Sequence, residues 1–199
     1  MKKRELVRFL KEHPQKEMSV AALADFQFQI LLQDDLNKEV KKVSDRMLPT
    51  ARLTEEAETA KSIEAVQTPE KLLRIMRKPM VFSNLTAMVK KALAMQDEAM
   101  PLIISQYKKT RHTVFIENAS KILSHADRKY TEEMLACYKD IWLPYAQALA
   151  CLLFGYHGLV DTIPLQLSEY ERFKRLYPDE TYDQCPLMAL GYLVDDIKD

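Results

Sequence analysis

Apolar residues recur at helical spacing along much of the chain. Residues 100–107 place them at i, i+3, i+4 and i+7, the period at which side chains share one face of an α-helix. The same spacing returns in two later stripes, Met134, Leu135, Tyr138 and Ile141, and then Ile163, Leu167, Tyr170, Phe173 and Tyr177. Each stripe predicts an amphipathic helix that buries one face.

Further apolar segments lie between these stripes and predict the helices that pack against them: residues 85–95, 114–123, 145–154 and 187–194. Prolines divide the chain into pieces of helical length, and proline is tolerated in the first turn of a helix but not in its middle. Thr68, Pro69 and Glu70 supply an N-cap, a first-turn proline and a first-turn acid. We therefore expect pairs of helices from about residue 69 onward.

Three of the predicted helices contain similar sequence segments, each with a tyrosine near its end. The tyrosines are 31 and then 32 residues apart, at Tyr107, Tyr138 and Tyr170. A period in the thirties with helical patterning indicates stacked two-helix repeats. A second echo, Gly155-Tyr-His-Gly-Leu-Val-Asp and Gly191-Tyr-Leu-Val-Asp, predicts a truncated last repeat at the C-terminal end.

The first third of the chain has a different pattern. Residues 19–47 contain no proline or glycine, which predicts either one long helix or two helices with a break near Asp34 and Asp35. The apolar positions there follow a coiled-coil-like spacing: Val20, Leu23, Phe26, Ile30, Leu36, Val40, Val43 and Met47. Residues 50–67 predict a further helix, expected to be the most exposed, with a thin apolar stripe of Leu53, Ala57, Ala60 and Ile63.

Composition supports an all-α fold. The chain has only three glycines among 199 residues, too few for turn-rich sheets or for glycine-rich phosphate loops. Three cysteines, Cys137, Cys151 and Cys185, lie in apolar surroundings without C-x-x-C spacing, so we expect buried free thiols and neither a zinc site nor a set of disulfides. No cofactor is expected.

No stretch of the chain suggests a membrane protein. The first residues are charged and amphipathic without an apolar core of signal-peptide type, and no apolar run approaches 18 residues. The expectation is a cytoplasmic protein of bacterial type that makes no membrane contact.

Charge is segregated along the chain although its total is zero. Residues 1–68 are balanced, residues 69–130 hold 12 basic and 5 acidic residues, and residues 131–199 hold 5 basic and 12 acidic residues. The middle and last segments therefore carry +7 and −7. Such runs are usually solvated faces, but the basic segment also offers candidate partner-binding residues: Lys71, Arg74, Lys78, Lys90, Lys91, Lys108, Lys109 and Arg111.

No catalytic or metal-binding constellation stands out. His125 with Asp127, and His157 with Asp161, have the residue types of a metal or acid–base site, yet their positions near predicted helix ends favour structural roles. The repeated tyrosines are expected to pack in the core. Trp142 follows Tyr138 by four residues and is expected on the same helix face, packed between repeats.

The pattern as a whole resembles HEAT-like α-solenoid repeats. The likeness covers about residues 69–199 and rests on a helix with Ala148-Leu149-Ala-Cys-Leu152, a short turn, and a second helix opening with Asp161-Thr-Ile-Pro164-Leu165. Tetratricopeptide repeats, with a period of 34, are the alternative, although their Trp-x-x-Leu-Gly signature is missing. The HEAT-like resemblance implies a right-handed α-α superhelix of antiparallel helix pairs whose concave face binds proteins.

These observations predict residues 1–66 as an N-terminal helical cap on repeats of residues 67–199, in one continuous structural unit. The expected function is that of a non-catalytic scaffold for a protein partner with an acidic surface. Nucleic-acid binding, as in HEAT-like DNA glycosylases, is an alternative that would use Lys90, Lys91, Lys108, Lys109 and Arg111. Self-association through the oppositely charged segments is a third possibility, and an enzyme is the least supported.

Overall fold

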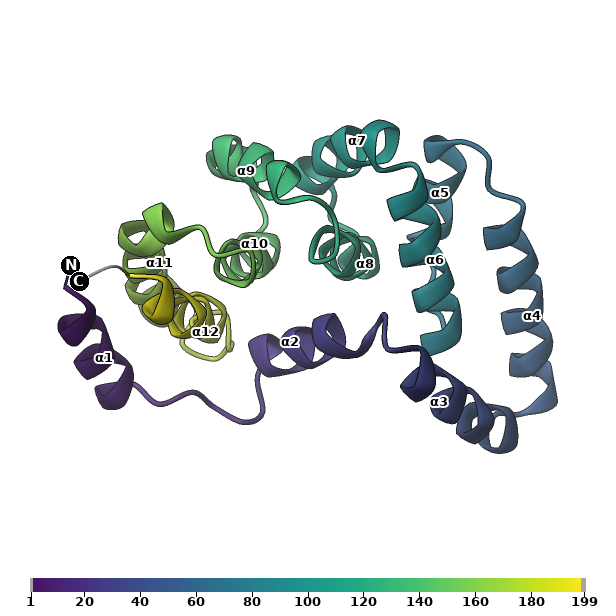
Figure 1. The fold of residues 1–199 in the computed structure, drawn as a ribbon, viewed down its shortest axis with the longest axis horizontal. Helices are drawn as coiled ribbons and strands as arrows, with labels where there is room; N and C mark the ends of the chain where they lie inside the picture. The colour runs from purple at the N-terminus through teal and green to yellow at the C-terminus, as the bar shows by residue number, and fades with distance from the viewer. Residues whose placement is uncertain (1, 198–199) are drawn as a thin grey trace. The chain divides into compact units, whose positions relative to one another are not determined.

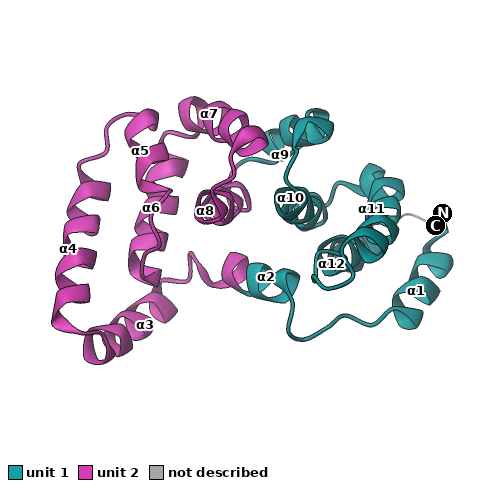
Figure 2. Ribbon diagram, turned by 180° about the vertical axis from the view of Figure 1, so that it is seen from behind, with its two compact units in different colours: residues 1–26, 127–199 teal, residues 27–126 magenta. Residues whose placement is uncertain are grey.

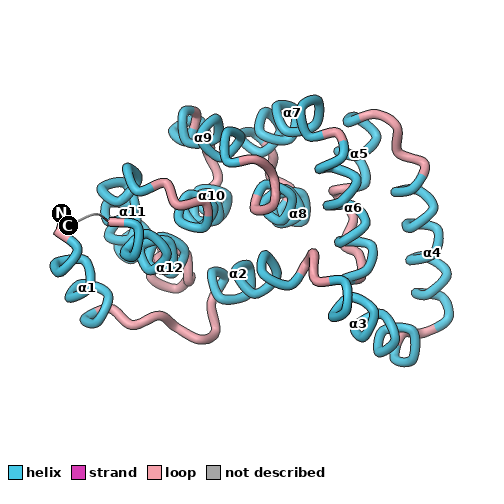
Figure 3. Tube along the Cα trace, in the orientation of Figure 1, coloured by secondary structure: helices cyan, strands magenta, loops and turns pink. Residues whose placement is uncertain are grey.

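A computed structural model describes residues 2–197, in which the regular secondary structure is helical and no β-strand occurs (Figure 3). This confirms the all-α prediction. The α-helices are α1 Lys3–Glu12, α2 Val20–Ile30, α3 Asp34–Met47, α4 Thr50–Glu64, α5 Pro69–Ile75, α6 Phe82–Ala94, α7 Gln96–Lys109, α8 Thr113–Leu123, α9 Arg128–Ala136, α10 Pro144–Tyr156, α11 Ile163–Leu176 and α12 Gln184–Leu193. None of the helices in this part of the chain is both long and apolar enough to cross a bilayer.

The chain folds as two compact units (Figure 2). Unit 1 combines residues 1–26 with residues 127–199, and unit 2 consists of residues 27–126. These boundaries differ from the expected junction near residue 66, because the first helix belongs with the last ones. The repeats, the cap and the superhelix remain predictions.

Residues 19–47 form two helices, with the break at residues 31–33. The buried residues of this region are not those that follow the coiled-coil-like spacing. Ala21, Phe28 and Leu31 are buried, whereas Leu23 and Phe26 are 62% and 58% exposed. Helix α3 buries none of its residues, so it is more exposed than α4, which buries three.

Helix α6 is the centre of unit 2, where it packs against α3, α4, α5, α7 and α8 (Figure 1). Helix α4 is attached to it by a polar contact. The Glu56 side chain accepts hydrogen bonds from the Val81 amide at 3.1 Å and from Asn84 Nδ2 at 2.7 Å. Of the four stripe residues predicted on α4, only Ile63 is buried, while Ala57 and Ala60 are exposed. The buried Glu56 carboxylate, rather than an alanine stripe, therefore determines which face of α4 packs against α6.

Helix α10 is the core of unit 1, and it lies unusually close to α12. A Cβ atom added to Gly155 would lie 2.3 Å from Ala189 Cα and 2.5 Å from Ala189 Cβ. No side chain fits at that distance, so glycine is required where the two helices cross. Gly191, its counterpart in the predicted echo, has no such neighbour: the nearest atom to its added Cβ is Gln15 Nε2 at 3.6 Å.

Helix α1 completes unit 1 by packing against α12. Its Leu6 is fully buried with Ile163, Leu190 and Leu193. The chain that follows α1 is held by two backbone amides, since Lys16 N donates to Gln184 Oε1 at 2.7 Å and Val20 N donates to Thr181 Oγ1 at 3.0 Å. These contacts span more than 160 residues of sequence.

The three repeated tyrosines are buried, as predicted. The expected helix around Tyr138 is wrong in detail, however. Helix α9 ends at Ala136, Tyr138 lies in a short 3₁₀-helix of residues 138–140, and Trp142 lies in the segment before α10. Trp142 is therefore not on a helix face with Tyr138, and it is 48% exposed rather than enclosed between repeats.

Candidate functional site

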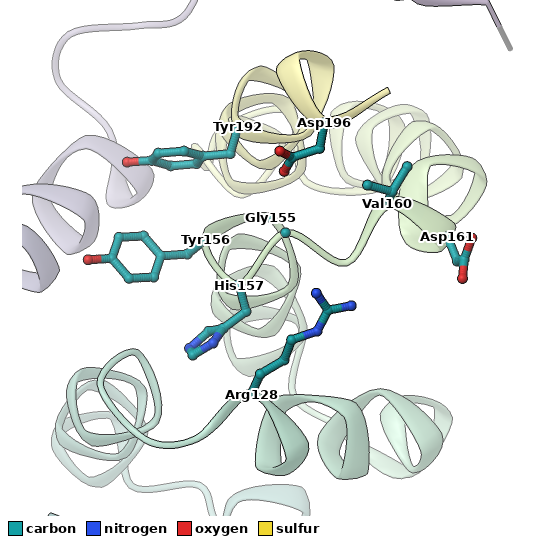
Figure 4. Close-up of a pocket in the computed structure, with 9 residues that line it drawn as sticks. Arg128, Gly155, Tyr156, His157, Val160, Asp161, Tyr192 and Asp196 are labelled. Carbon is teal, nitrogen blue, oxygen red and sulfur yellow. The ribbon is translucent and has the colours of Figure 1, made fainter. Parts of the chain in front are cut away.

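A polar pocket of about 580 Å³ opens in unit 1 beside the C-terminal end of α10 (Figure 4). Its residues come from the start of α9, the end of α10, the segment that follows α10, the end of α12, and the short 3₁₀-helix of residues 194–196 after α12. They are Arg128, Gly155, Tyr156, His157, Gly158, Val160, Asp161, Tyr192 and Asp196. The volume lies within the range of roughly 300–1,000 Å³ that is typical of small-molecule sites.

A glycine turn forms one wall of the pocket. Helix α10 ends at Tyr156, and Gly158 has φ +67°, a left-handed conformation that favours glycine. The Gly158 amide donates to the Gly155 carbonyl at 2.9 Å, which closes the turn. A Cβ atom at Gly158 would lie 3.2 Å from Asp196 Oδ2. The Asp196 carboxylate therefore lies directly over the turn.

Aromatic rings form another wall. The Tyr156 ring packs edge-to-face against Tyr192, with 5.7 Å between centroids, and against His157, with 6.0 Å between centroids. The Tyr192 hydroxyl donates a hydrogen bond to Asp25 Oδ1. Partial burial and the negative charge of Asp25 raise the pKa of Tyr156 above its ordinary value. The phenol of Tyr156 is therefore neutral at physiological pH.

The pocket contains side chains of both charges. Arg128 is the first residue of α9, and its Nε pairs with Glu132 Oε1 at 2.9 Å. Figure 4 shows its guanidinium reaching into the pocket from one side and the Asp196 carboxylate approaching from the other, with Asp161 at the far edge. Within residues 2–197 no group of three or more His, Cys, Asp and Glu side chains is arranged to hold a metal ion.

His157 and Asp161, paired in the sequence as a candidate metal or acid–base site, do line this pocket together. The other members were missed by sequence reasoning. A signal was present, because most of the lining residues belong to the Gly155 and Gly191 echo segments. That echo was interpreted as architecture alone, since nothing in one sequence shows that the two segments face each other across a cavity.

The eight predicted partner-binding residues lie in unit 2, in two settings. Lys90 and Lys91 are on α6 and make contacts within the unit. Lys90 Nζ pairs with Asp34 Oδ1 at 2.8 Å, and this hydrogen bond and the lysine charge lower the pKa of Asp34. Lys91 Nζ donates to the Glu64 carbonyl at 3.0 Å. These two lysines thus attach α6 to α3 and α4.

The other six residues lie on α5, at the end of α7 and in the segments that follow these helices. Lys71 and Arg74 are three residues apart on one side of α5, Lys78 follows in the turn after the helix, and all three are exposed. Helix α5 packs against α7, which ends at Lys109. We call the exposed residues of this set the α5–α7 basic face: Lys71, Arg74, Lys78, Lys109 and Arg111.

Contacts with α8 hold the two parts of this face near each other. Asn118 Nδ2 donates to the carbonyls of Met76 at 3.0 Å and Lys78 at 3.3 Å. The Arg77 guanidinium lies 5.9 Å from the centre of the Phe115 ring. Phe115 is in the first turn of α8 and Asn118 is in its middle, and α8 begins two residues after Arg111.

Comparison of the chain with known protein families, with curated proteins and with solved structures found no match.

Proposed function

We propose that the chain is a non-catalytic helical scaffold that binds a protein partner through the α5–α7 basic face. The observation that carries this proposal is that five exposed cations lie on α5, at the end of α7 and in the segments that follow these two helices, while α8 contacts the segment after α5 through Phe115 and Asn118. Unit 2 as a whole contains 16 Lys and Arg residues and 12 Asp and Glu residues, a net charge of +4. An acidic partner surface is the complement of such a face and would be attracted to it at long range.

A protein partner fits this face better than a nucleic acid. Leu102 is 38% exposed and precedes Lys109 by seven residues, about two turns, so both lie on one side of α7. An apolar contact surrounded by charge is the usual anatomy of a protein interface. Single strands are instead bound by stacking on exposed aromatic rings. The large exposed aromatic side chains among residues 2–197, Phe26 and Trp142, both belong to unit 1.

The test is a titration of the ¹⁵N-labelled chain with a polyglutamate peptide, observed by NMR. The expected result is salt-sensitive binding with amide shifts concentrated in residues 71–78 and 108–112. Charge reversal by Lys78→Glu with Arg111→Glu should abolish these shifts. A matched control with the same change in net charge, Arg46→Glu with Lys61→Glu, should preserve them, because both control residues are exposed on α3 and α4.

Three results would decide against the proposal. Equal loss of binding in both double variants would show attraction to net charge alone. Tighter, salt-dependent binding of duplex DNA would favour the nucleic-acid alternative. A dimer at low salt that dissociates at high salt, observed by analytical ultracentrifugation together with absent peptide binding, would favour self-association between the +4 unit and unit 1, which carries −4.

A further inference from the structure

The pocket of unit 1 places a cation and an anion on opposite sides of one cavity. Arg128 and Asp196 both line it, yet they form no ion pair with each other. Arg128 uses only its Nε to pair with Glu132, and no hydrogen bond or ion pair within residues 2–197 engages the Asp196 carboxylate. Each of these two side chains can therefore form a further ion pair or hydrogen bond with a group in the cavity.

The Asp196 side of the pocket favours a cation for three separate reasons. The carboxylate itself is negative. Helices α10 and α12 both end beside the pocket, at Tyr156 and Leu193, and helix C-termini carry partial negative charge. The rings of Tyr156 and Tyr192 form a neutral aromatic wall, which attracts ammonium and guanidinium groups.

The Arg128 side favours a carboxylate. A guanidinium presents N–H groups in a planar fork that matches the two oxygens of a carboxylate. Arg128 also stands at the N-terminal end of α9, where the helix dipole is positive. Because Arg128 and Asp196 form no ion pair with each other, a ligand that engages both must carry an anionic group and a cationic group.

We propose that this pocket binds a basic amino acid, with the carboxylate at Arg128 and the cationic side chain at Asp196, beside the aromatic wall. A guanidinium or ammonium side chain is the group that the Asp196 carboxylate and the aromatic wall attract, and the α-carboxylate of the same ligand is the group that suits Arg128. The same chemistry is offered by free arginine or lysine and by a peptide that ends in one of them. The site is in unit 1 and is independent of the α5–α7 basic face.

The experiment is an NMR titration of the full ¹⁵N-labelled chain with L-arginine, with the peptide Ala-Ala-Arg, and with agmatine, which is arginine without its carboxylate. Saturable shifts are expected at the amides of Tyr156–Asp161 and Tyr192, with a dissociation constant of about 1 mM for so open a site. Tighter binding of L-arginine would identify the free amino acid as the ligand, and tighter binding of Ala-Ala-Arg would identify a peptide C-terminus. Binding of either ligand supports the proposal. Agmatine should bind about tenfold more weakly because it cannot engage Arg128.

Two variants and a control complete the design. Asp196→Asn and Arg128→Gln should each weaken arginine binding about tenfold, since each removes one charge-assisted contact. Asp195→Asn is the control: it removes the same charge one residue away, from an exposed side chain outside the pocket lining. Absence of saturable shifts at the pocket amides overturns the proposal. So does agmatine binding as tight as arginine binding, or equal weakening by Asp195→Asn and Asp196→Asn.

Discussion

The hydroxyl of Tyr138 lies 3.4 Å from Sγ of Cys151, thirteen residues further along the chain. In unit 2 the hydroxyl of Tyr107 lies 3.3 Å from Oγ of Ser120, at the same separation in sequence. In both cases a buried tyrosine contacts a small polar side chain within the α-helix that follows it, Ser120 in α8 and Cys151 in α10. The third tyrosine differs, because the Tyr170 hydroxyl accepts a hydrogen bond from Lys174 and its ring packs against Phe9 of α1.

This recurring contact gives the tyrosine spacing a physical meaning. A period of 31 residues places equivalent tyrosines against equivalent points of the following helices. It supports the idea of a two-helix repeat, whereas the HEAT-like family and the superhelix stay predictions.

The close crossing of α10 and α12 predicts opposite effects for two glycine substitutions. Gly155→Ala introduces a methyl group where Ala189 leaves no space, so the free energy of unfolding should fall by about 3 kcal/mol. Gly191→Ala meets only an ordinary contact and removes a flexible residue from a helix, so it should raise that free energy by about 0.5–1 kcal/mol. Urea unfolding measures both. Equal effects of the two substitutions would contradict the crossing.

Glu56 should account for much of the attachment of α4 to α6. Replacing its carboxylate in Glu56→Gln weakens the hydrogen bonds from the Val81 amide and Asn84 and the ion pair with Arg52, so we expect a loss of about 2 kcal/mol in unfolding free energy. The control is Glu55→Gln, an exposed neighbour that also pairs with Arg52. It should change stability by less than about 0.5 kcal/mol. A similar loss in both variants would assign the effect to Arg52 alone.

The three cysteines should differ in reactivity toward a thiol reagent such as DTNB. Cys151 and Cys185 are buried, and burial raises the pKa of both thiols, so neither supplies a thiolate at pH 8. Cys137 is only half-buried. The native chain should therefore release one equivalent of thiol rapidly, and the urea-unfolded chain should release three. Rapid release of three equivalents by the native chain would mean that α10 and α12 open readily.

Stability should decline at alkaline pH, in part through Cys151. Burial raises the pKa of this thiol from 9.0 to about 12, so above pH 9 the unfolded chain loses a proton that the folded chain retains. The stabilisation is complete below pH 9 and decreases as pH rises toward 12, by about 1.4 kcal/mol for each pH unit. The stability difference between the wild type and Cys151→Ala, measured by urea unfolding from pH 8 to 11, should therefore shrink with rising pH. A constant difference would be inconsistent with a buried protonated thiol.

Some parts of the molecule were predictable because they depend on local sequence. Glycine scarcity, good helix formers and i, i+3, i+4 spacing determine the all-α class, and proline positions mark several helix starts, such as Pro69 at α5 and Pro144 at α10. The burial of the three tyrosines also follows from their stripes. The position of the break between α2 and α3 was among the stated alternatives.

Other parts required contacts between distant residues. The apolar spacing did not reveal which face of α2 is buried, because the apolar stripe containing Leu23 and Phe26, which is exposed, has the same local pattern as a core face. The pocket was not predicted for a related reason: Arg128 and Asp196 are 68 residues apart, and nothing in the neighbouring sequence links them. The basic segment was visible in the sequence. Its division between the α6 lysines and the α5–α7 basic face was not.

The sequence by itself determined that this chain is helical, where most helices begin and which segments are charged, because helix propensity, capping and periodicity act over a few residues. Only the tertiary structure decided that α1 belongs with α12, that Gly155 rather than Gly191 marks a close helix crossing, and that two echo segments line one pocket. Those features depend on which helices lie beside each other, and that choice follows from the packing of the entire core.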